Sequence, residues 1–191
     1  MRLFYLITII GGAFLLEGCL GAALIGSVAV ATKSVTDPRS IGRQVDDGTL
    51  EARVSAAIKK DQDLTRHARI ITTAYEGKIL LIGQSPNLEL AERAKHIAMR
   101  IEGVEEVYNE IRQAKPVDLS EIYRDTWITT KIKARIFSSD LVKSSTIKVI
   151  TEAGEVFLLG ILTQEEGVLA AKIASEIDGV KRVITAFSYL N

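Results

Sequence analysis

The sequence predicts an α+β protein that contains two copies of one small domain. The segment EGKILLIGQ at 76–84 recurs as AGEVFLLGI at 153–161, and IEGVEEVYNEI at 101–111 recurs as IDGVKRVITAF at 177–187. The copies are therefore offset by 77 residues in the first pair and 76 in the second. Because this period exceeds the roughly 20–50 residues of a solenoid repeat, each copy is expected to be a domain of its own.

The first three elements of each copy are expected to be a helix and a hairpin. Apolar residues recur at every fourth position, as Leu50, Val54 and Ile58 do in the first copy, which is helical spacing. Two runs rich in Ile, Val, Leu and Thr follow, and a tight turn at Gly77 or Gly154 joins them as a hairpin. The expected ranges are 47–60, 68–75 and 78–84 in the first copy, and 125–138, 146–151 and 155–161 in the second.

A second helix and a last strand complete each copy. Ser85-Pro86 predicts a helix cap followed by proline at the first helical position, and Thr163 with Glu166 has the spacing of a capping box. Gly103 and Gly179 are expected to end these helices, as glycine often does. This order of elements predicts two helices packed on one face of a small three-stranded mixed sheet. The last strands are expected at 104–112 and 180–189.

The glycines and the strands between them resemble the BON domain. The pattern of that domain is a hairpin glycine, a strand of the form G-x-V/I-x-L-x-G, and a Gly-Val pair that opens the last strand. GKILLIG at 77–83 with GV at 103–104 fits it, and so does GEVFLLG at 154–160 with GV at 179–180. The resemblance implies BON domains at 46–113 and 124–191, joined by a linker at 114–123.

The N-terminal segment is typical of a bacterial signal peptide. Arg2 supplies a positive charge, and the following residues 3–16 are almost entirely apolar. The sequence LEGC at 16–19 resembles a lipobox, which implies removal of residues 1–18 and acylation of Cys19, for example with palmitate. Glu17 departs from the small or uncharged residue that is usual there. An uncleaved anchor and an ordinary signal peptide with a stray cysteine are the alternatives.

The residue that follows the cysteine indicates which membrane holds the lipid anchor. Leu20 stands where an aspartate would favour the inner membrane, so the resemblance implies a lipid anchor in the outer membrane, facing the periplasm. Residues 19–45 are rich in Gly, Ala, Ser and Thr and are expected to form a flexible tether after the lipidated cysteine.

The overall charge excludes binding that depends on a global electrostatic field. The chain has 24 basic and 24 acidic residues, and removal of residues 1–18 takes away one of each. A neutral protein is not drawn as a whole to nucleic acid or to anionic lipid. Any binding driven by charge must therefore come from a local patch.

Such a patch is expected on the first helix of the second copy. Trp127, the only tryptophan, and Phe137 fall opposite the apolar stripe and lie among cations, whereas the matching residues of the first copy are Thr49 and Lys59. An indole suits the headgroup zone of a bilayer, and cations attract anionic lipid. The expected lipid-binding residues are Arg124, Trp127, Thr130, Lys131, Lys133, Ala134, Arg135 and Phe137. The alternative is that Trp127 packs against the first domain or the linker and that the cations form an ordinary solvated face.

Other kinds of chemistry find little support. His67 and His96 have no cluster of ligands near them in the sequence, so neither a metal nor a cofactor is expected. No recognisable arrangement of nucleophile, histidine and acid is present, so an enzyme is not expected. Asp46 and Asp47 are interpreted as helix caps and first-turn acids rather than as a catalytic pair.

Taken over the whole chain, the sequence resembles the outer-membrane lipoproteins with two BON domains. The resemblance implies binding of anionic phospholipid without catalysis, and roles in outer-membrane integrity and in envelope remodelling at the cell-division site. The alternative function is a periplasmic adaptor for outer-membrane protein assembly machinery or for cell-wall remodelling hydrolases, with Trp127 as a contact. Nucleic acid is not expected as a partner because of the export signal, and the oligomeric state is left open.

Overall fold

The computed structural model describes residues 41–142 and 144–190, and residues 39–191 form one compact unit. The signal peptide, the lipobox with Cys19 and residues 19–40 of the expected tether lie outside the described residues. All described elements belong to the unit at 39–191, and so do the three hydrophobic clusters.

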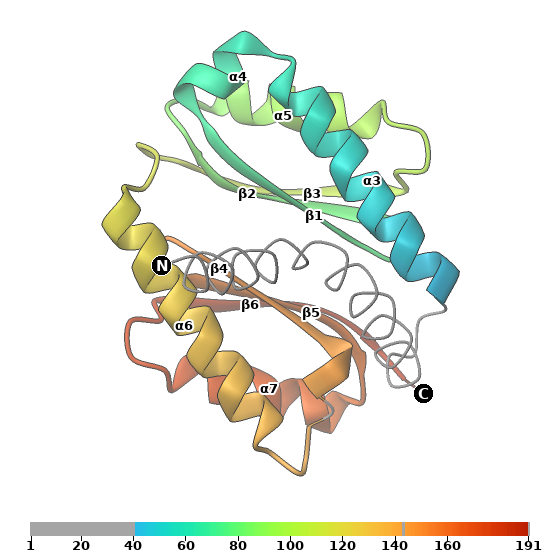
Figure 1. The fold of residues 1–191 in the computed structure, drawn as a ribbon, viewed down its shortest axis with the longest axis vertical. Coiled ribbons are helices and arrows are strands. Elements are labelled where there is room, and N and C mark those ends of the chain that lie inside the picture. Colours follow the sequence, from blue (N-terminus) through green and yellow to red (C-terminus); the bar gives the residue numbers. More distant parts are fainter. Residues whose placement is uncertain (1–40, 143, 191) are drawn as a thin grey trace, which may run out of the picture. The chain divides into compact units, whose positions relative to one another are not determined.

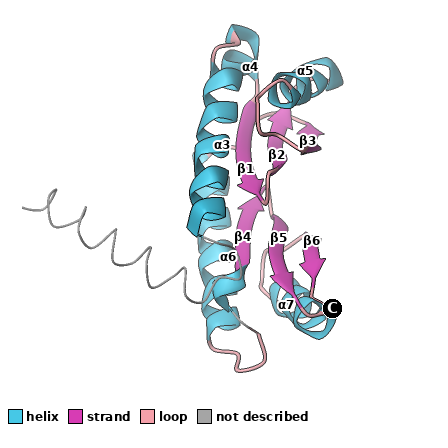
Figure 2. Cartoon of the chain, turned by 90° about the vertical axis from the view of Figure 1, so that its right-hand side faces the viewer, coloured by secondary structure: helices cyan, strands magenta, loops and turns pink. Residues whose placement is uncertain are grey.

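The predicted α+β fold and its repeated order of elements are confirmed (Figure 1 and Figure 2). The first half contains α3 (Ile41–Lys59), α4 (Gln62–His67), β1 (Arg69–Tyr75), β2 (Lys78–Ser85), α5 (Leu88–Met99) and β3 (Glu106–Gln113). The second half contains α6 (Leu119–Phe137), a short 3-10 turn (Ser144–Thr146), β4 (Ile147–Glu152), β5 (Glu155–Leu162), α7 (Gln164–Ser175) and β6 (Arg182–Tyr189). The short helix α4 was not expected; the Asp61 side chain caps it by accepting from two backbone N–H groups.

Each half contains one three-stranded mixed sheet. The strand orders are β1-β2-β3 and β4-β5-β6; the first pair in each sheet is antiparallel and the second is parallel. Two long helices cover one face of each sheet, α3 and α5 in the first half and α6 and α7 in the second (Figure 1).

The core of each half lies between its helices and its sheet. The α3 residues Leu50, Val54 and Ile58 are buried against β1, β2 and α5. Their counterparts on α6 are Ile128, Ile132 and Ile136, which are at most 1 % exposed. These two stripes confirm the helical spacing read from the sequence and fix which side of each helix faces outward.

A buried aspartate ties the first helix of each half to its hairpin. The Asp47 carboxylate accepts the backbone N–H groups of Glu76 and Gly77 at 2.9 Å each. The Asp125 carboxylate accepts those of Ala153 and Gly154 at 2.7 and 2.9 Å. The interpretation of Asp47 as a first-turn acid was wrong, because α3 is already helical at Ile41 and Asp47 lies in its second turn.

Several helix boundaries differ from the prediction. Asp118 caps α6 by accepting the backbone N–H of Glu121, so residues 119–123 of the expected linker are helical. Residues 41–45, expected in the tether, are helical in α3.

The ends of the second helices also differ. Asn87, rather than Ser85, caps α5 because its side chain accepts from the backbone N–H of Leu90. The capping box of Thr163 and Glu166 on α7 is confirmed. The helices end before the glycines that were expected to stop them, and those glycines serve the following turns with positive φ angles.

The faces of the two sheets that carry no helix pack against each other. Their shared cluster contains Tyr75, Leu80, Ile82, Phe157 and Leu159. A buried carboxylate, Glu152, joins the halves: it accepts from the Arg69 guanidinium at 2.9 Å and from the Gln84 side-chain amide at 3.0 Å. Gln84 in turn accepts the backbone N–H of Val117 from the linker. These contacts make the two domains parts of one packed body.

Candidate membrane-binding surface

The contacts on the inner side of α6 determine which of its residues face solvent. Ile128, Ile132 and Ile136 are buried, and the Asp125 carboxylate is bonded to the β4–β5 turn. A helix fixed along one side in this way cannot rotate, so residues on its opposite side face solvent.

All eight residues predicted to bind lipid are exposed on this helix. Trp127 is 47 % exposed and Phe137 is 80 % exposed, so neither aromatic ring is buried in the body. The alternative, in which Trp127 packs against the first domain or the linker, stays open because only part of this side chain is exposed. An exposed tryptophan is uncommon in a soluble domain, because its large ring is usually buried for the most part.

The structure brings the tryptophan and one cation together. The Lys131 Nζ lies 3.7 Å from the centroid of the Trp127 ring, which is the geometry of a cation–π pair. This pair places a positive charge over an amphipathic ring, and both groups remain at the surface.

The other cations lie on either side of this pair. Arg135 forms a long, exposed ion pair at 3.8 Å with Glu176, the residue that follows α7, and this pair offsets part of its charge. Lys133 lines a shallow cleft between α6 and β4, and Arg69 lines the same cleft. Lys131 and Lys133 are therefore the better candidates for attracting an anion.

Sequence reasoning missed two exposed apolar residues of α6, Leu119 and Tyr123, and a third, Leu141, in the turn that follows the helix. Leu119, Tyr123 and Leu141 are 70 %, 73 % and 74 % exposed. Leu119, Tyr123 and Trp127 are spaced by four residues on one helix, so they line up along it. The signal that could have found the first two is Asp118 with Glu121 three residues later, which marks a helix start before Leu119.

The cap at the start of α6 is ionised more readily than an ordinary aspartate. The Ser120 hydroxyl and the Glu121 backbone N–H both donate to the Asp118 carboxylate, and they lower the pKa of Asp118. The negative charge lies at the helix N-terminus, where it is favourable.

The matching side of α3 offers an internal comparison. Its residues at the corresponding positions are all exposed as well: Thr49, Ala52, Arg53, Ala56 and Lys59. None of the three aromatic residues of α6, Tyr123, Trp127 and Phe137, has an aromatic counterpart on α3. The same helix in the same fold therefore does not require exposed aromatic rings.

The described residues contain neither a metal centre nor a membrane-crossing helix by the usual criteria. Within 41–142 and 144–190, no group of three His, Cys, Asp or Glu side chains is placed to hold a metal ion. Over the same residues, no helix combines the length and the apolar character needed to cross a bilayer.

Comparison with known proteins accounts for both halves of the chain. The BON domain model matches residues 46–115 and 124–191. Outer membrane lipoprotein DolP of Haemophilus influenzae is 45 % identical over 183 residues, which cover 96 % of this chain and 94 % of the relative.

Two further relatives show the same similarity over shorter spans. A 21 kDa hemolysin of Actinobacillus pleuropneumoniae is 47 % identical, with 81 % of this chain and 79 % of the relative covered. Osmotically-inducible protein Y of Escherichia coli is 33 % identical, with 75 % and 72 % covered. The chain belongs to the BON-domain family and, within it, to the outer-membrane lipoproteins that carry two BON domains.

Proposed function

We propose that this protein is a non-enzymatic lipoprotein whose second BON domain binds anionic phospholipid through α6. One observation carries the proposal: α6 exposes Trp127, Phe137 and neighbouring cations at positions where the equivalent helix α3 exposes small or charged residues. The fold gives no reason for this difference, so a binding function is the simplest explanation.

The chemistry of the surface suits the headgroup zone of a bilayer. Tyrosine and tryptophan rings favour that zone because one end is apolar and the other forms hydrogen bonds. Each lysine or arginine near an anionic membrane contributes roughly 1 kcal/mol. Leu119 and Tyr123 extend the apolar line beyond Trp127, so several turns of α6 could lie along the membrane surface together.

Lipidation of Cys19 would strengthen this contact without enlarging it. An anchor in the outer membrane holds α6 near the bilayer and raises its effective concentration there. A weak surface with a few cations is then sufficient, which agrees with a chain whose total charge is zero. Support of outer-membrane integrity and of envelope remodelling at the division site would follow from this membrane contact.

An adaptor function is the second candidate. Exposed Tyr123 and Trp127 next to Arg124 have the composition of a protein-binding hot spot. On this alternative, α6 docks outer-membrane assembly machinery or a regulator of cell-wall hydrolases. The two functions differ in whether lipid alone, without protein, binds α6.

Cosedimentation of the unlipidated body, residues 20–191, with liposomes tests the proposal. We expect sedimentation with anionic vesicles at low salt, little with zwitterionic vesicles, and loss of binding for Trp127→Glu. The matched control is Thr49→Glu, which places the same charge at the equivalent position of α3 and should leave binding unchanged. If wild-type residues 20–191 do not sediment with anionic vesicles at low salt, the proposal of lipid binding is wrong. Crosslinking from α6 should then identify a protein partner.

A further inference from the structure

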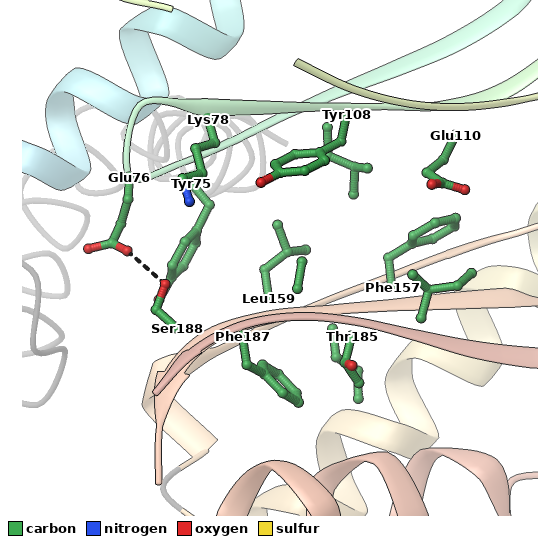
Figure 3. Close-up of a pocket in the computed structure, with 14 residues that line it drawn as sticks. Tyr75, Glu76, Lys78, Tyr108, Glu110, Phe157, Leu159, Thr185, Phe187 and Ser188 are labelled. Carbon is green, nitrogen blue, oxygen red and sulfur yellow. Dashed lines mark hydrogen bonds between the residues drawn. The ribbon is translucent and has the colours of Figure 1, made fainter. Parts of the chain in front are cut away.

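The two sheets do not fill the space between them completely. A cavity of about 330 Å³ remains between their facing sides. Figure 3 shows Tyr108 and Glu110 extending into it from β3, and Leu159 and Phe157 extending toward them from β5. Leu80 and Ile184 also line it, so its wall is mainly apolar.

The size and the lining of the cavity indicate the kind of ligand. Small-molecule pockets have volumes of about 300–1,000 Å³, an apolar wall and a few polar groups that fix orientation. This cavity lies at the lower end of that range, which suits one acyl chain better than the two chains of an ordinary phospholipid. The aromatic rings of Tyr108 and Phe157 give it flat apolar surfaces against which a chain can pack.

One end of the cavity carries a pair of opposite charges. Glu76 and Lys78 lie at the end near Tyr75 and Ser188, and Glu110 lies at the other end (Figure 3). Within residues 41–142 and 144–190, the bond that the Glu76 carboxylate accepts is a long one from the Ser188 hydroxyl, at 3.4 Å. The Lys78 ammonium makes a long ion pair with Glu106 at 3.9 Å, in which both side chains are about half exposed.

The far end offers no comparable charge for a ligand. Glu110 is paired with Arg112 at 3.0 Å, and Arg112 is also bonded to Glu155 of the second domain. The two charged groups with only long contacts of their own are therefore the Glu76 carboxylate and the Lys78 ammonium, which lie at the same end of the cavity. A carboxylate beside an ammonium complements a headgroup that carries both charges.

We propose that this cavity binds a single-chain zwitterionic phospholipid, with the acyl chain between the sheets, the ligand ammonium at Glu76 and its phosphate at Lys78. This site is separate from α6, because none of the lining residues of the cavity belongs to that helix. The proposal therefore does not depend on membrane binding by α6.

The test is a titration of the body, residues 20–191, with lauroyl lysophosphatidylethanolamine below its micelle concentration. Nuclear magnetic resonance follows the methyl groups of Leu80, Leu159 and Ile184, and the Trp127 indole reports on α6 separately. We expect saturable shifts of the three methyl signals that persist in Trp127→Glu. Shifts of the indole alone would overturn the proposal.

Two variants and one second ligand sharpen the test. Ala186→Phe should reduce affinity at least tenfold, because Ala186 lines the cavity from an exposed position and the larger ring enters the space of the chain. Lys78→Glu should weaken binding about fivefold, as expected for loss of a charge-assisted contact. Unchanged affinity in Ala186→Phe, with an unchanged circular dichroism spectrum, would contradict the site. Dodecanoate that binds as tightly as the lysophospholipid would contradict its zwitterionic class.

Discussion

The first helices of the two domains are alike on the side that packs and different on the side that faces solvent. Both bury an apolar stripe, and both use an aspartate in the same place, Asp47 or Asp125, to accept two N–H groups of the hairpin turn. Outside, α3 has small and charged residues, while α6 has exposed aromatic and apolar side chains. Packing explains the shared side. Packing does not constrain the residues of the outer side, and the proposed binding function accounts for the aromatic residues that α6 has there.

The shared scaffold would be broken most severely at the second glycine of each hairpin. Gly83 has a φ of +127°, and an added Cβ would lie 1.9 Å from the Arg69 carbonyl oxygen. At Gly160 the corresponding approach, to the Thr146 carbonyl oxygen, is 2.6 Å, and no unusual φ is involved. We expect Gly83→Ala to lower the free energy of unfolding by about 3 kcal/mol or more, and Gly160→Ala by less.

Urea denaturation followed by circular dichroism would measure both glycine variants. Greater loss in Gly160→Ala than in Gly83→Ala would show that the contact distance and the backbone angle do not set the cost.

The buried aspartates Asp47 and Asp125 should contribute similar amounts of stability to their two domains. Asp47→Asn and Asp125→Asn each replace one acceptor oxygen with an NH₂ group that faces a backbone N–H. Because both sites are buried, we expect each variant to lose about 1–3 kcal/mol of unfolding free energy. Thermal unfolding of the two variants side by side provides the measurement. A cost confined to one domain would contradict the equivalence.

Charge on the outer side should matter for membrane binding in one domain only. Lys131→Gln removes the cation over Trp127, and we expect about fivefold weaker binding to anionic vesicles, which corresponds to about 1 kcal/mol. The matched variant Arg53→Gln on α3 should bind like the wild type. Equal losses of affinity in Lys131→Gln and Arg53→Gln would show that attraction depends on total charge. That result would contradict the assignment of α6 as the membrane-binding surface.

The smallest expected effect concerns the cap of α6. The pKa of Asp118 is lowered in the folded protein, chiefly by the Ser120 hydroxyl and the Glu121 N–H. A carboxyl group with a lowered pKa adds stability above its unfolded pKa, and that contribution is lost as the pH falls through the folded value. Asn87, which caps α5, has no such titration. Carbon resonances of the Asp118 carboxyl should therefore titrate below the usual range of aspartate, and a midpoint at or above that range would contradict the cap.

Much of the fold followed from the sequence because the repeat shows each signal twice. The spacing of Ile128, Ile132 and Ile136 repeated that of the first copy, and the hairpin glycines marked both turns. The helix starts were less secure. Residues 41–46 and 119–124 precede the regular apolar spacing, and the short cap signal of Asp118 and Glu121 lies outside that spacing.

The candidate site was only partly predictable, for the same reason. A wheel drawn from residue 125 contains Trp127 and Phe137 but omits Leu119 and Tyr123. The cavity between the sheets was not predictable at all. Its walls come from strands of both domains, and neither repeat alone indicates that the two bare faces meet.

The most direct test uses Trp127 as its own reporter, since it is the only tryptophan. The body at 20–191 would be mixed with anionic vesicles containing lipids brominated at known depths, and quenching of the indole fluorescence would be measured. We predict strong quenching by bromines near the headgroup zone, and none with zwitterionic vesicles. Vesicle binding with unquenched Trp127 fluorescence would contradict the assignment of α6 as the membrane-binding surface.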